Sequence, residues 1–190
     1  QSVKLISRDP GPPPMEFIKT SGGLFLDMAI HDFDLARHLM QNEVTEVYAT
    51  ASIFGDLPLE IVGDVDTAVT ILKFDNGGFA TIENSRNSIY GYDQRVEVFG
   101  EKGLLSSQNK SYDTVLFADN HGVHSPKPMG FFIERYKESY VNIMNSFVQS
   151  LVQKTNSELS FSDGLYSLAI SLAAKKSNEE NRVILLSEIF

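Results

Sequence analysis

The sequence has 190 residues, 42% of them hydrophobic, and a formal net charge of −9 from 16 Lys and Arg against 25 Asp and Glu. This length allows one domain, or at most two small ones, with a substantial hydrophobic core, and the composition is that of a globular chain rather than a disordered one. The acidic balance argues against nucleic acid and against an anionic membrane surface as partners, because both attract a basic face.

The N-terminal residues predict a strand, a stiff connector and a helix. Residues 1–6 alternate as a short strand does, and the run Asp9-Pro10-Gly11-Pro12-Pro13-Pro14 then favours an extended connector, because proline cannot continue a helix. From residue 24 to residue 40 apolar side chains recur at helical spacing, with Ser21 as the expected N-cap. Two glycines lie between Ser21 and this helix, where the backbone can bend or approach a ligand closely.

Alternating segments joined by short turns fill the middle of the chain. The turns at residues 75–78 and 100–103 are of the hairpin kind, which implies antiparallel neighbours, because parallel strands need long crossovers. Helical spacing returns at 131–151, and a second helix is expected from the capping pair Ser162-Asp163 to residue 178. This order predicts an α+β domain with helices packed on one face of an antiparallel sheet. The expected strands are 47–54, 67–74, 79–83, 94–99 and 104–107, with 114–118 and 183–186 as further candidates.

The most informative stretch of the first long helix contains Asp27 and His31. These residues are four apart, so their side chains meet on one face of a regular helix, and Asp34 and His38 continue the same stripe. A carboxylate one turn from an imidazole fixes the tautomer of the ring and raises its basicity. A general base that works near neutral pH has this arrangement.

Spacing alone leaves three interpretations of this stripe open. The commonest is the solvated face of an amphipathic helix. A metal site is the second, because Asp and His are good ligands, but no HExxH motif is present and four ligands on one helix cannot surround one ion, so we expect no metal. The third is acid–base catalysis, which the position one turn after two glycines favours.

Other features carry weaker signals. The polar stretch at residues 85–95 is interpreted as an exposed loop or as a loop that contacts a polyol or sugar. His121 and His124 are interpreted as surface residues. No G-x-G-x-x-G, G-x-x-x-x-G-K-[ST] or G-x-S-x-G motif occurs, so the sequence encodes no dinucleotide-phosphate site.

The compartment is constrained only loosely. No apolar run approaches the roughly 20 residues of a membrane span, and no signal peptide opens the chain. The sequence has no cysteine, which excludes disulfides and a thiol nucleophile, and nothing in it asks for an oxidising compartment. We expect a cytoplasmic protein. The first residue is Gln1 rather than Met, which suggests a fragment or a processed chain.

The run from Ser21 to Arg37 resembles the G-G-x-x-x-D-x-x-x-H-x-x-D signature of the glucose–fructose oxidoreductase/inositol dehydrogenase/MocA-type family. The segments Asn84-Ser85-Arg86, Tyr90 to Gly100 and Asp9 to Pro14 resemble the inositol 2-dehydrogenase members more closely. The resemblance spans nearly the whole chain.

The resemblance implies that residues 1–190 form a single C-terminal domain for substrate binding and oligomerisation, with a large open, mainly antiparallel sheet. The N-terminal Rossmann domain of the family is absent from the sequence. Its glycine-rich loop is missing, and so is its Glu-Lys-Pro segment with the catalytic lysine, since Glu101-Lys102-Gly103 lacks the proline. NAD or NADP is then bound mainly by that absent domain, no cofactor-binding residue is assigned here, and the chain alone is expected to be inactive.

The resemblance also implies an activity, the oxidation of a secondary alcohol of a cyclitol or sugar, with myo-inositol 2-dehydrogenase favoured. His31 matches the proposed general base of the family, and Asp27 matches the carboxylate near the substrate hydroxyl. Tyr90 and Asp9 match substrate contacts. The expected partners are a polyol or sugar and further copies of the chain, as a dimer or tetramer formed through the sheet. The alternative is a non-catalytic oligomerisation or carbohydrate-binding domain.

Overall fold

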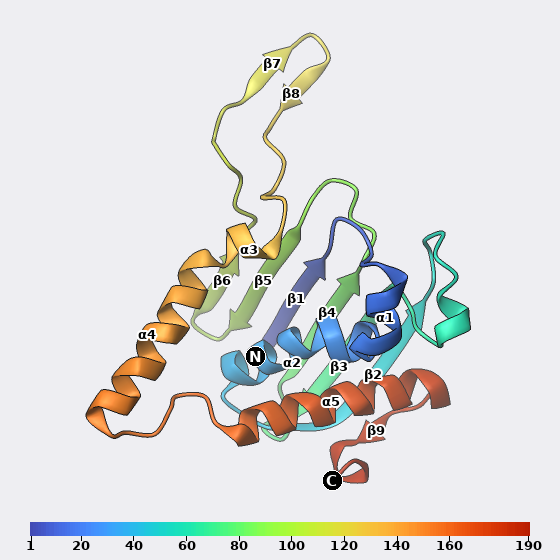
Figure 1. The fold of residues 1–190 in the computed structure, drawn as a ribbon, viewed down its shortest axis with the longest axis vertical. Coiled ribbons are helices and arrows are strands. Elements are labelled where there is room, and N and C mark those ends of the chain that lie inside the picture. The colour runs from blue at the N-terminus through green and yellow to red at the C-terminus, as the bar shows by residue number, and fades with distance from the viewer.

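A seven-stranded sheet forms the centre of the fold (Figure 1). Its strands are β1 (Ser2–Arg8), β2 (Val44–Ser52), β3 (Thr67–Phe74), β4 (Phe79–Ser85), β5 (Asp93–Gly100), β6 (Gly103–Ser107) and β9 (Ile184–Leu185). They lie in the order β6-β5-β1-β4-β3-β2-β9, and only the pair β1 and β4 is parallel. This computed structural model describes residues 1–190, and it confirms the α+β fold with a large, open, mainly antiparallel sheet.

The one parallel pair follows from the chain order. The predicted hairpin turns join β3 to β4 and β5 to β6, and Gly77 in the first of them has a φ of 82°. In the sheet, the first strand, β1, lies between β4 and β5. Between β1 and its neighbour β4 the chain passes through two α-helices and the strands β2 and β3. A connection of that length permits parallel pairing, which a hairpin does not.

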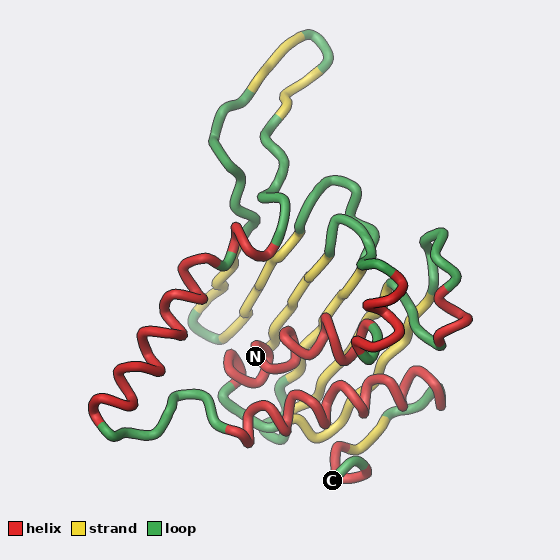
Figure 2. The backbone as a smooth tube through the Cα atoms, in the orientation of Figure 1, coloured by secondary structure: helices red, strands yellow, loops and turns green.

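Two long helices cover one face of the sheet (Figure 2). They are α2 (Ile30–Met40), which packs on β1, and α5 (Phe161–Glu180), which packs on β2 and on α2. The remaining helical segments are α1 (Met15–Ser21), the π-helix η1 (Phe25–Ala29), the 3₁₀ turns η2 (Leu59–Val62) and η3 (Leu186–Glu188), α3 (Phe132–Arg135) and α4 (Lys137–Gln153). No helix is both long and apolar enough to cross a membrane.

The start of the first predicted helix differs from the expectation. Ser21 is not an N-cap but the last residue of α1, a helix that sequence analysis missed because it buries only Ile18 and so shows no apolar stripe. Gly22, with a φ of 91°, ends α1 in the left-handed conformation that glycine adopts readily. The predicted single helix over 24–40 is instead a π-turn followed by α2.

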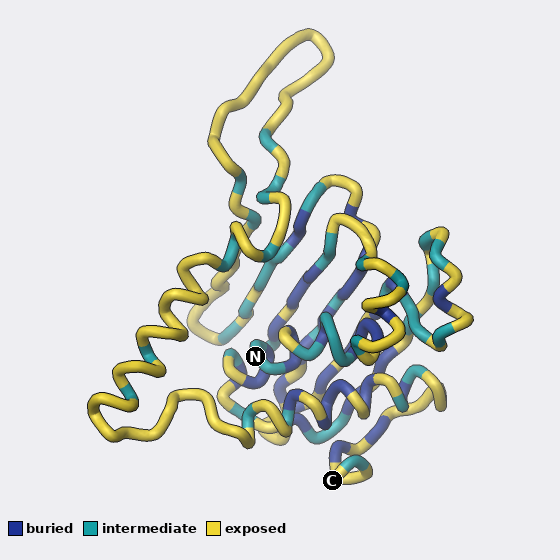
Figure 3. The backbone as a smooth tube through the Cα atoms, in the orientation of Figure 1, coloured by how far each residue is buried: buried dark blue, intermediate teal, exposed yellow.

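The hydrophobic core lies between the sheet and the helices α2 and α5. A cluster of 22 buried residues fills this layer, and it includes Leu5, Phe33, Leu72 and Ile170, each at most 1% exposed. Figure 3 shows that the buried residues are concentrated in the sheet centre and in the helices that cover it. Removing this much apolar surface from water is the main force that holds α2 in place.

Residues 101–160 behave differently, because none of them is buried. They form β6, a long protruding arm that ends in the hairpin β7 (Phe117–Asp119) and β8 (Gly122–His124), and the helices α3 and α4 (Figure 1). The predicted strand at 114–118 is therefore displaced toward the arm tip. Both arm histidines, His121 and His124, are exposed as predicted.

The predicted helix over 131–151 is broken at Tyr136 into α3 and α4. Tyr136 of the apolar stripe packs against Tyr92, but the stripe is exposed further along α4, where Phe147 is 49% exposed and Leu151 is 62% exposed. The final helix, α5, begins earlier than predicted. Ser160 is its N-cap, in a capping box with Asp163.

Candidate functional site

The carboxyl ends of β1 and β4 lie side by side because these strands run parallel, with Arg8 opposite Ser85. The residues that follow the two strands are tied together by backbone hydrogen bonds. The amide of Asp9 donates to the carbonyl of Ser85 at 2.8 Å, and the carbonyl of Asp9 accepts from the amide of Ser88 at 2.9 Å. Asp9 and the residue after Ser85, Arg86, are thereby held at one edge of the sheet.

The helical residues of the candidate site face this edge. Asp27 lies in the π-turn η1, and its Oδ2 accepts a hydrogen bond of 2.9 Å from Nη2 of Arg86. Asp64 caps the start of the same turn, because its Oδ1 accepts from the amide of Leu24 at 2.9 Å. A side chain at Gly23 would place its Cβ 2.5 Å from that oxygen, so this position requires glycine.

Asp9, Asp27 and His31 lie near enough for their charges to influence one another, although no hydrogen bond joins them. Burial raises the pKa of Asp27 above its ordinary value, while the charges of Arg86 and His31 lower it. Burial raises the pKa of Asp9 to about 6, the charge of Arg86 opposes this rise, and the nearby carboxylate of Asp27 adds to it. The imidazole of His31 is exposed. It can therefore reach a bound molecule.

Asp32 is a member of this group that sequence analysis did not single out. It is buried, and its carboxylate accepts from Ser7 Oγ at 2.7 Å and from Asn84 Nδ2 at 2.6 Å. Burial raises its pKa to about 6, against those two hydrogen bonds and the charge of His31. No sequence signal marks the preceding π-turn, so a regular helical period gave no reason to choose Asp32.

Asp34, which the predicted stripe included, belongs to a different contact. It accepts a hydrogen bond of 3.0 Å from Ser167 Oγ on α5 and lies 3.7 Å from Nη1 of Arg37. His38, the last residue of that stripe, is exposed near the other end of α2. Of the four residues of the stripe, Asp27 and His31 therefore face the candidate site, Asp34 contacts α5, and His38 is exposed to solvent.

Tyr90 makes its hydrogen bonds in a separate cluster. Its hydroxyl accepts from Arg8 Nη1 at 2.7 Å and donates to Asp93 Oδ2 at 2.5 Å, and none of its hydrogen bonds reaches Asp9, Asp27 or His31. Arg8 follows Ser7 on β1, so the two side chains point to opposite faces of the sheet. No hydrogen bond therefore links Tyr90 with the other three candidate residues.

Tyr92 is the tyrosine that lies near the carboxylates. It is buried, and burial together with Tyr136, Asp9 and Asp32 raises the pKa of its phenol well above the usual range. Its ring packs edge-on against Phe131 and Tyr136. It belongs to the polar stretch at 85–95, but the residue pattern gave no reason to prefer it to Tyr90.

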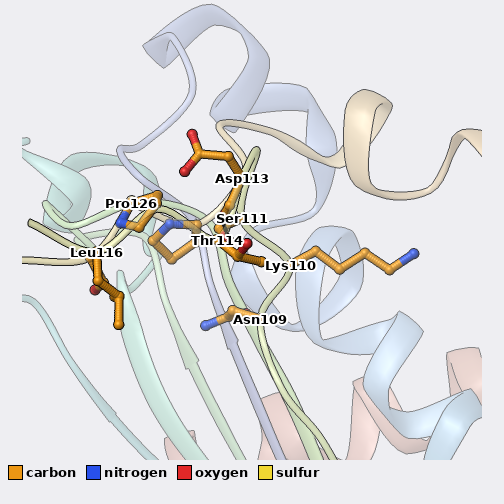
Figure 4. A pocket seen from close by; sticks show the side chains of 9 residues that line it. Asn109, Lys110, Ser111, Asp113, Thr114, Leu116 and Pro126 are labelled. Atoms are coloured by element: carbon orange, nitrogen blue, oxygen red, sulfur yellow. Dashed lines mark hydrogen bonds between the residues drawn. The ribbon is translucent and has the colours of Figure 1, made fainter.

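A polar hollow of about 320 Å³ opens at the base of the arm (Figure 4). Its lining comes from the segments before β7 and after β8 and includes Asn109, Lys110 and Ser125, but none of the carboxylates near His31. It is therefore distinct from the candidate site. No group of three or more His, Cys, Asp or Glu is arranged to hold a metal ion.

Comparisons with known proteins show the family to which the chain belongs. Residues 1–106 match the GFO/IDH/MocA C-terminal domain. The chain is 44% identical over 98% of its length to a myo-inositol 2-dehydrogenase of Thermotoga maritima, and it covers 56% of that protein. It superposes with a TM-score of 0.96 on the crystal structure of a probable dehydrogenase from Thermotoga maritima, at 44% identity. The superposition covers 100% of this chain and 57% of that one.

A third similarity concerns a structure with bound ligands. The chain superposes with a TM-score of 0.87 and 26% identity on scyllo-inositol dehydrogenase from Lactobacillus casei with bound NAD(H) and scyllo-inositol, covering 98% of this chain and 56% of that one. The chain thus spans about half the length of the relatives it matches. It belongs to the GFO/IDH/MocA C-terminal domain family.

Proposed function

We propose that this chain is the substrate-binding half of an NAD(P)-dependent dehydrogenase that oxidises a secondary alcohol of a cyclitol, with myo-inositol as the favoured substrate. The observation that carries the proposal is that Asp9 and the Arg86-bound Asp27 lie at one edge of the sheet, with His31 near enough for its charge to act on both carboxylates. The names of the relatives support the substrate class, because the compared proteins include a myo-inositol 2-dehydrogenase and a scyllo-inositol dehydrogenase.

In the proposed reaction His31 acts as the general base. Its neutral imidazole takes the proton of the substrate hydroxyl, and the C–H bond of the same carbon breaks with its electron pair to leave a ketone. Asp27 stabilises the imidazolium that forms, and the exposure of His31 allows the proton to pass on to water. An imidazole suits this task because its ordinary pKa lies near neutral pH.

The chain supplies the proton chemistry rather than the cofactor site. A bound nicotinamide supplies the acceptor for the hydride, and with no glycine-rich phosphate loop in this sequence, residues outside the chain hold NAD or NADP. The site is rich in carboxylates, with Asp9, Asp27 and Asp32 around one arginine and one histidine. Such a site suits the cationic lysine that the family resemblance places in a preceding Rossmann domain.

Asp9 and Tyr90 are the proposed substrate contacts. Asp9 is about half ionised near pH 6, its pKa, and at neutral pH its carboxylate accepts hydrogen bonds from polyol hydroxyls. For Tyr90, the family resemblance is the only support for a role as a substrate contact. Its hydroxyl must release either Arg8 or Asp93 to bind a polyol, or bind it as an additional partner.

The test uses the full-length protein with the preceding Rossmann domain that the proposal requires. We expect His31→Ala to lower kcat for NADH formation from myo-inositol by about 10²–10⁴-fold, because a positioned general base contributes that much, while the KM for NAD changes little. The matched control is His38→Ala, an exposed histidine of the same helix, which keeps wild-type turnover. Near-wild-type kcat in His31→Ala contradicts the proposal.

A second proposed role is assembly into a dimer or tetramer through the sheet. The face opposite α2 and α5 exposes apolar side chains on adjacent strands, with Tyr48 of β2 opposite Ile71 of β3 and Val69 two residues away. A face of this kind is typical of a surface that a second copy covers. If it forms the interface, Ile71→Asp gives a smaller mass in light scattering than the wild type. The control Asn120→Asp, at the arm tip, keeps the wild-type mass.

Binding without the cofactor separates these roles from that of a carbohydrate-binding module. Titration of the 190-residue chain with myo-inositol is expected to show weak binding at most, because the proposed site needs a second domain to complete it. Tight binding by the isolated chain favours the carbohydrate-binding alternative. The cytoplasmic location stays a prediction.

A further inference from the structure

Arg86 is the largest side chain that the fold buries completely, with 1% of it exposed. A buried guanidinium is costly unless carboxylates or carbonyls surround it. Its Nη2 donates to Asp27 at 2.9 Å, and its Nη1 lies 3.6 Å from Oδ2 of Asp64 without a hydrogen bond. One guanidinium thus lies between two carboxylates that belong to different segments of the chain.

Both carboxylates are associated with the start of the π-turn. Asp27 is part of η1, and Asp64 binds the amide of Leu24, which immediately precedes η1. Arg86 is therefore connected to η1 directly through Asp27 and indirectly through Asp64. π-turns occur preferentially at functional sites.

The backbone at Arg86 is itself fixed. Its amide donates to the carbonyl of Asp66 at 2.8 Å, directly after β4 ends at Ser85. The carboxylate of Asp66 in turn accepts from the amides of Phe54 and Gly55. The backbone that carries the guanidinium is thus anchored by contacts that do not involve η1.

We infer that Arg86 is a positioning residue for the proposed reaction: its buried guanidinium holds the Asp27 carboxylate beside His31. The inference rests on the proposed function in so far as Asp27 and His31 act on the substrate. Arg86 touches no reacting atom in this account. It keeps Asp27 ionised and oriented despite the burial that favours the protonated acid.

A second nearly buried arginine, Arg37 of α2, offers a comparison. Arg37 is 9% exposed and donates two hydrogen bonds to the carboxylate of Glu43, at 2.9 Å and 2.8 Å. This pair fastens the far end of α2 and involves none of the candidate site residues. Arg37 therefore serves as a structural control for Arg86.

The first readout is the titration of Asp27 in the 190-residue chain, followed by carboxyl ¹³C NMR. The charged groups that face Asp27 are Arg86, His31 and Asp64, with Asp9 close by. Removal of an opposite charge in such a setting raises a carboxyl pKa by about 1–3 pH units, so we expect a rise of this size in R86Q. R37Q lowers stability and leaves the Asp27 titration unchanged.

The second readout is kinetic and uses the full-length protein with myo-inositol and NAD. We expect R86Q to lower kcat by about 10- to 100-fold, as a displaced catalytic group does, with little change in the KM for NAD. R86K gives smaller effects in the same direction, because lysine keeps a charge but can face only one of the two carboxylates. If R86Q fails to fold, the Asp27 titration and the kcat of R86K still test the inference.

Wild-type titration of Asp27 in both Arg86 variants overturns the inference. So does a shift of equal size in R37Q, since that result reflects general loosening of the fold. The NMR readout needs no turnover, so it still tests Arg86 if His31→Ala proves that the proposed reaction is wrong. In that case Arg86 orients a carboxylate, but not for this chemistry.

Discussion

The chain consists of two parts that differ in how they are held. Residues 1–100 and 161–190, the packed body, contain every buried residue, including the core cluster and the carboxylates around Arg86. Residues 101–160, the exposed segment, contain none, although they include the apolar stripe of α4. The same chain thus has one region stabilised by its own core and one that buries no residue, although Phe131 and Tyr136 of the second region pack against Tyr92 of the first.

The candidate site lies wholly in the packed body, and the difference explains why. A proton-transfer site needs side chains fixed to within a fraction of an ångström, and only packed neighbours and hydrogen bonds provide that. Asp32 has this support from Ser7 and Asn84, and Asp27 has it from Arg86. The exposed segment offers surface rather than rigidity, which fits contact with another copy or domain.

The largest expected effect tests the core of the packed body directly. Phe33 of α2 is fully buried beside the site, and Phe33→Ala should lower the free energy of unfolding by about 3–5 kcal/mol, because it leaves a cavity. Phe147→Ala on α4 is the matched truncation in the exposed segment, and it should cost less than about 1 kcal/mol in the monomer. Urea unfolding at a concentration where light scattering shows monomer measures both. Equal losses contradict the division into two parts.

The next prediction uses the burial of Asp32, whose pKa in the folded state is about 6 against about 3.9 in an unfolded chain. Between these values the native state holds the proton that the unfolded state releases, so stability falls as the pH rises from about 4 to about 6. The full effect is on the order of 2–3 kcal/mol. In Asp32→Asn the unfolding free energy should fall less over this range, although Asp9, with a pKa also about 6, retains part of the slope.

The substitution is suited to the site, because the Oδ1 of Asn84 has no partner and a flipped Asn84 amide can accept from the new amide. Urea unfolding at several pH values between 4 and 7 gives the measurement. Parallel curves for wild type and Asp32→Asn show that this carboxyl is not the buried acid that the structure indicates.

Sequence reasoning predicted the packed body better than the exposed segment, for a physical reason. Strands such as β3 alternate because one face is buried, so Ala68, Leu72 and Phe74 mark it clearly. The arm buries nothing, so no alternation fixed where β7 begins or revealed β8. Local patterns also cannot show pairing between distant segments, which is why the parallel contact of β1 with β4 was not foreseen.

The candidate site was predicted in part for a similar reason. The spacing of Asp27 and His31 is local, and it identified the pair. Asp32 and Arg86 acquire their importance only through burial and through contacts with residues far away in the sequence. The π-turn η1 has no residue signature, so the register of the helix face beyond Asp27 could not be derived from the sequence.

The smallest expected effect concerns the arm. Its base is closed by the hydrogen bond from the amide of Met129 to the carbonyl of Lys110 and by the bridge between Ser111 and Pro128. Replacement of residues 113–127 by a short Gly-Ser turn should therefore change the unfolding free energy of the monomer by less than about 0.5 kcal/mol, since no buried contact is lost. A clear loss shows that the arm supports the packed body. An unchanged monomer with a smaller assembled mass shows instead that its exposed apolar side chains, such as Leu116 and Phe117, contact another copy.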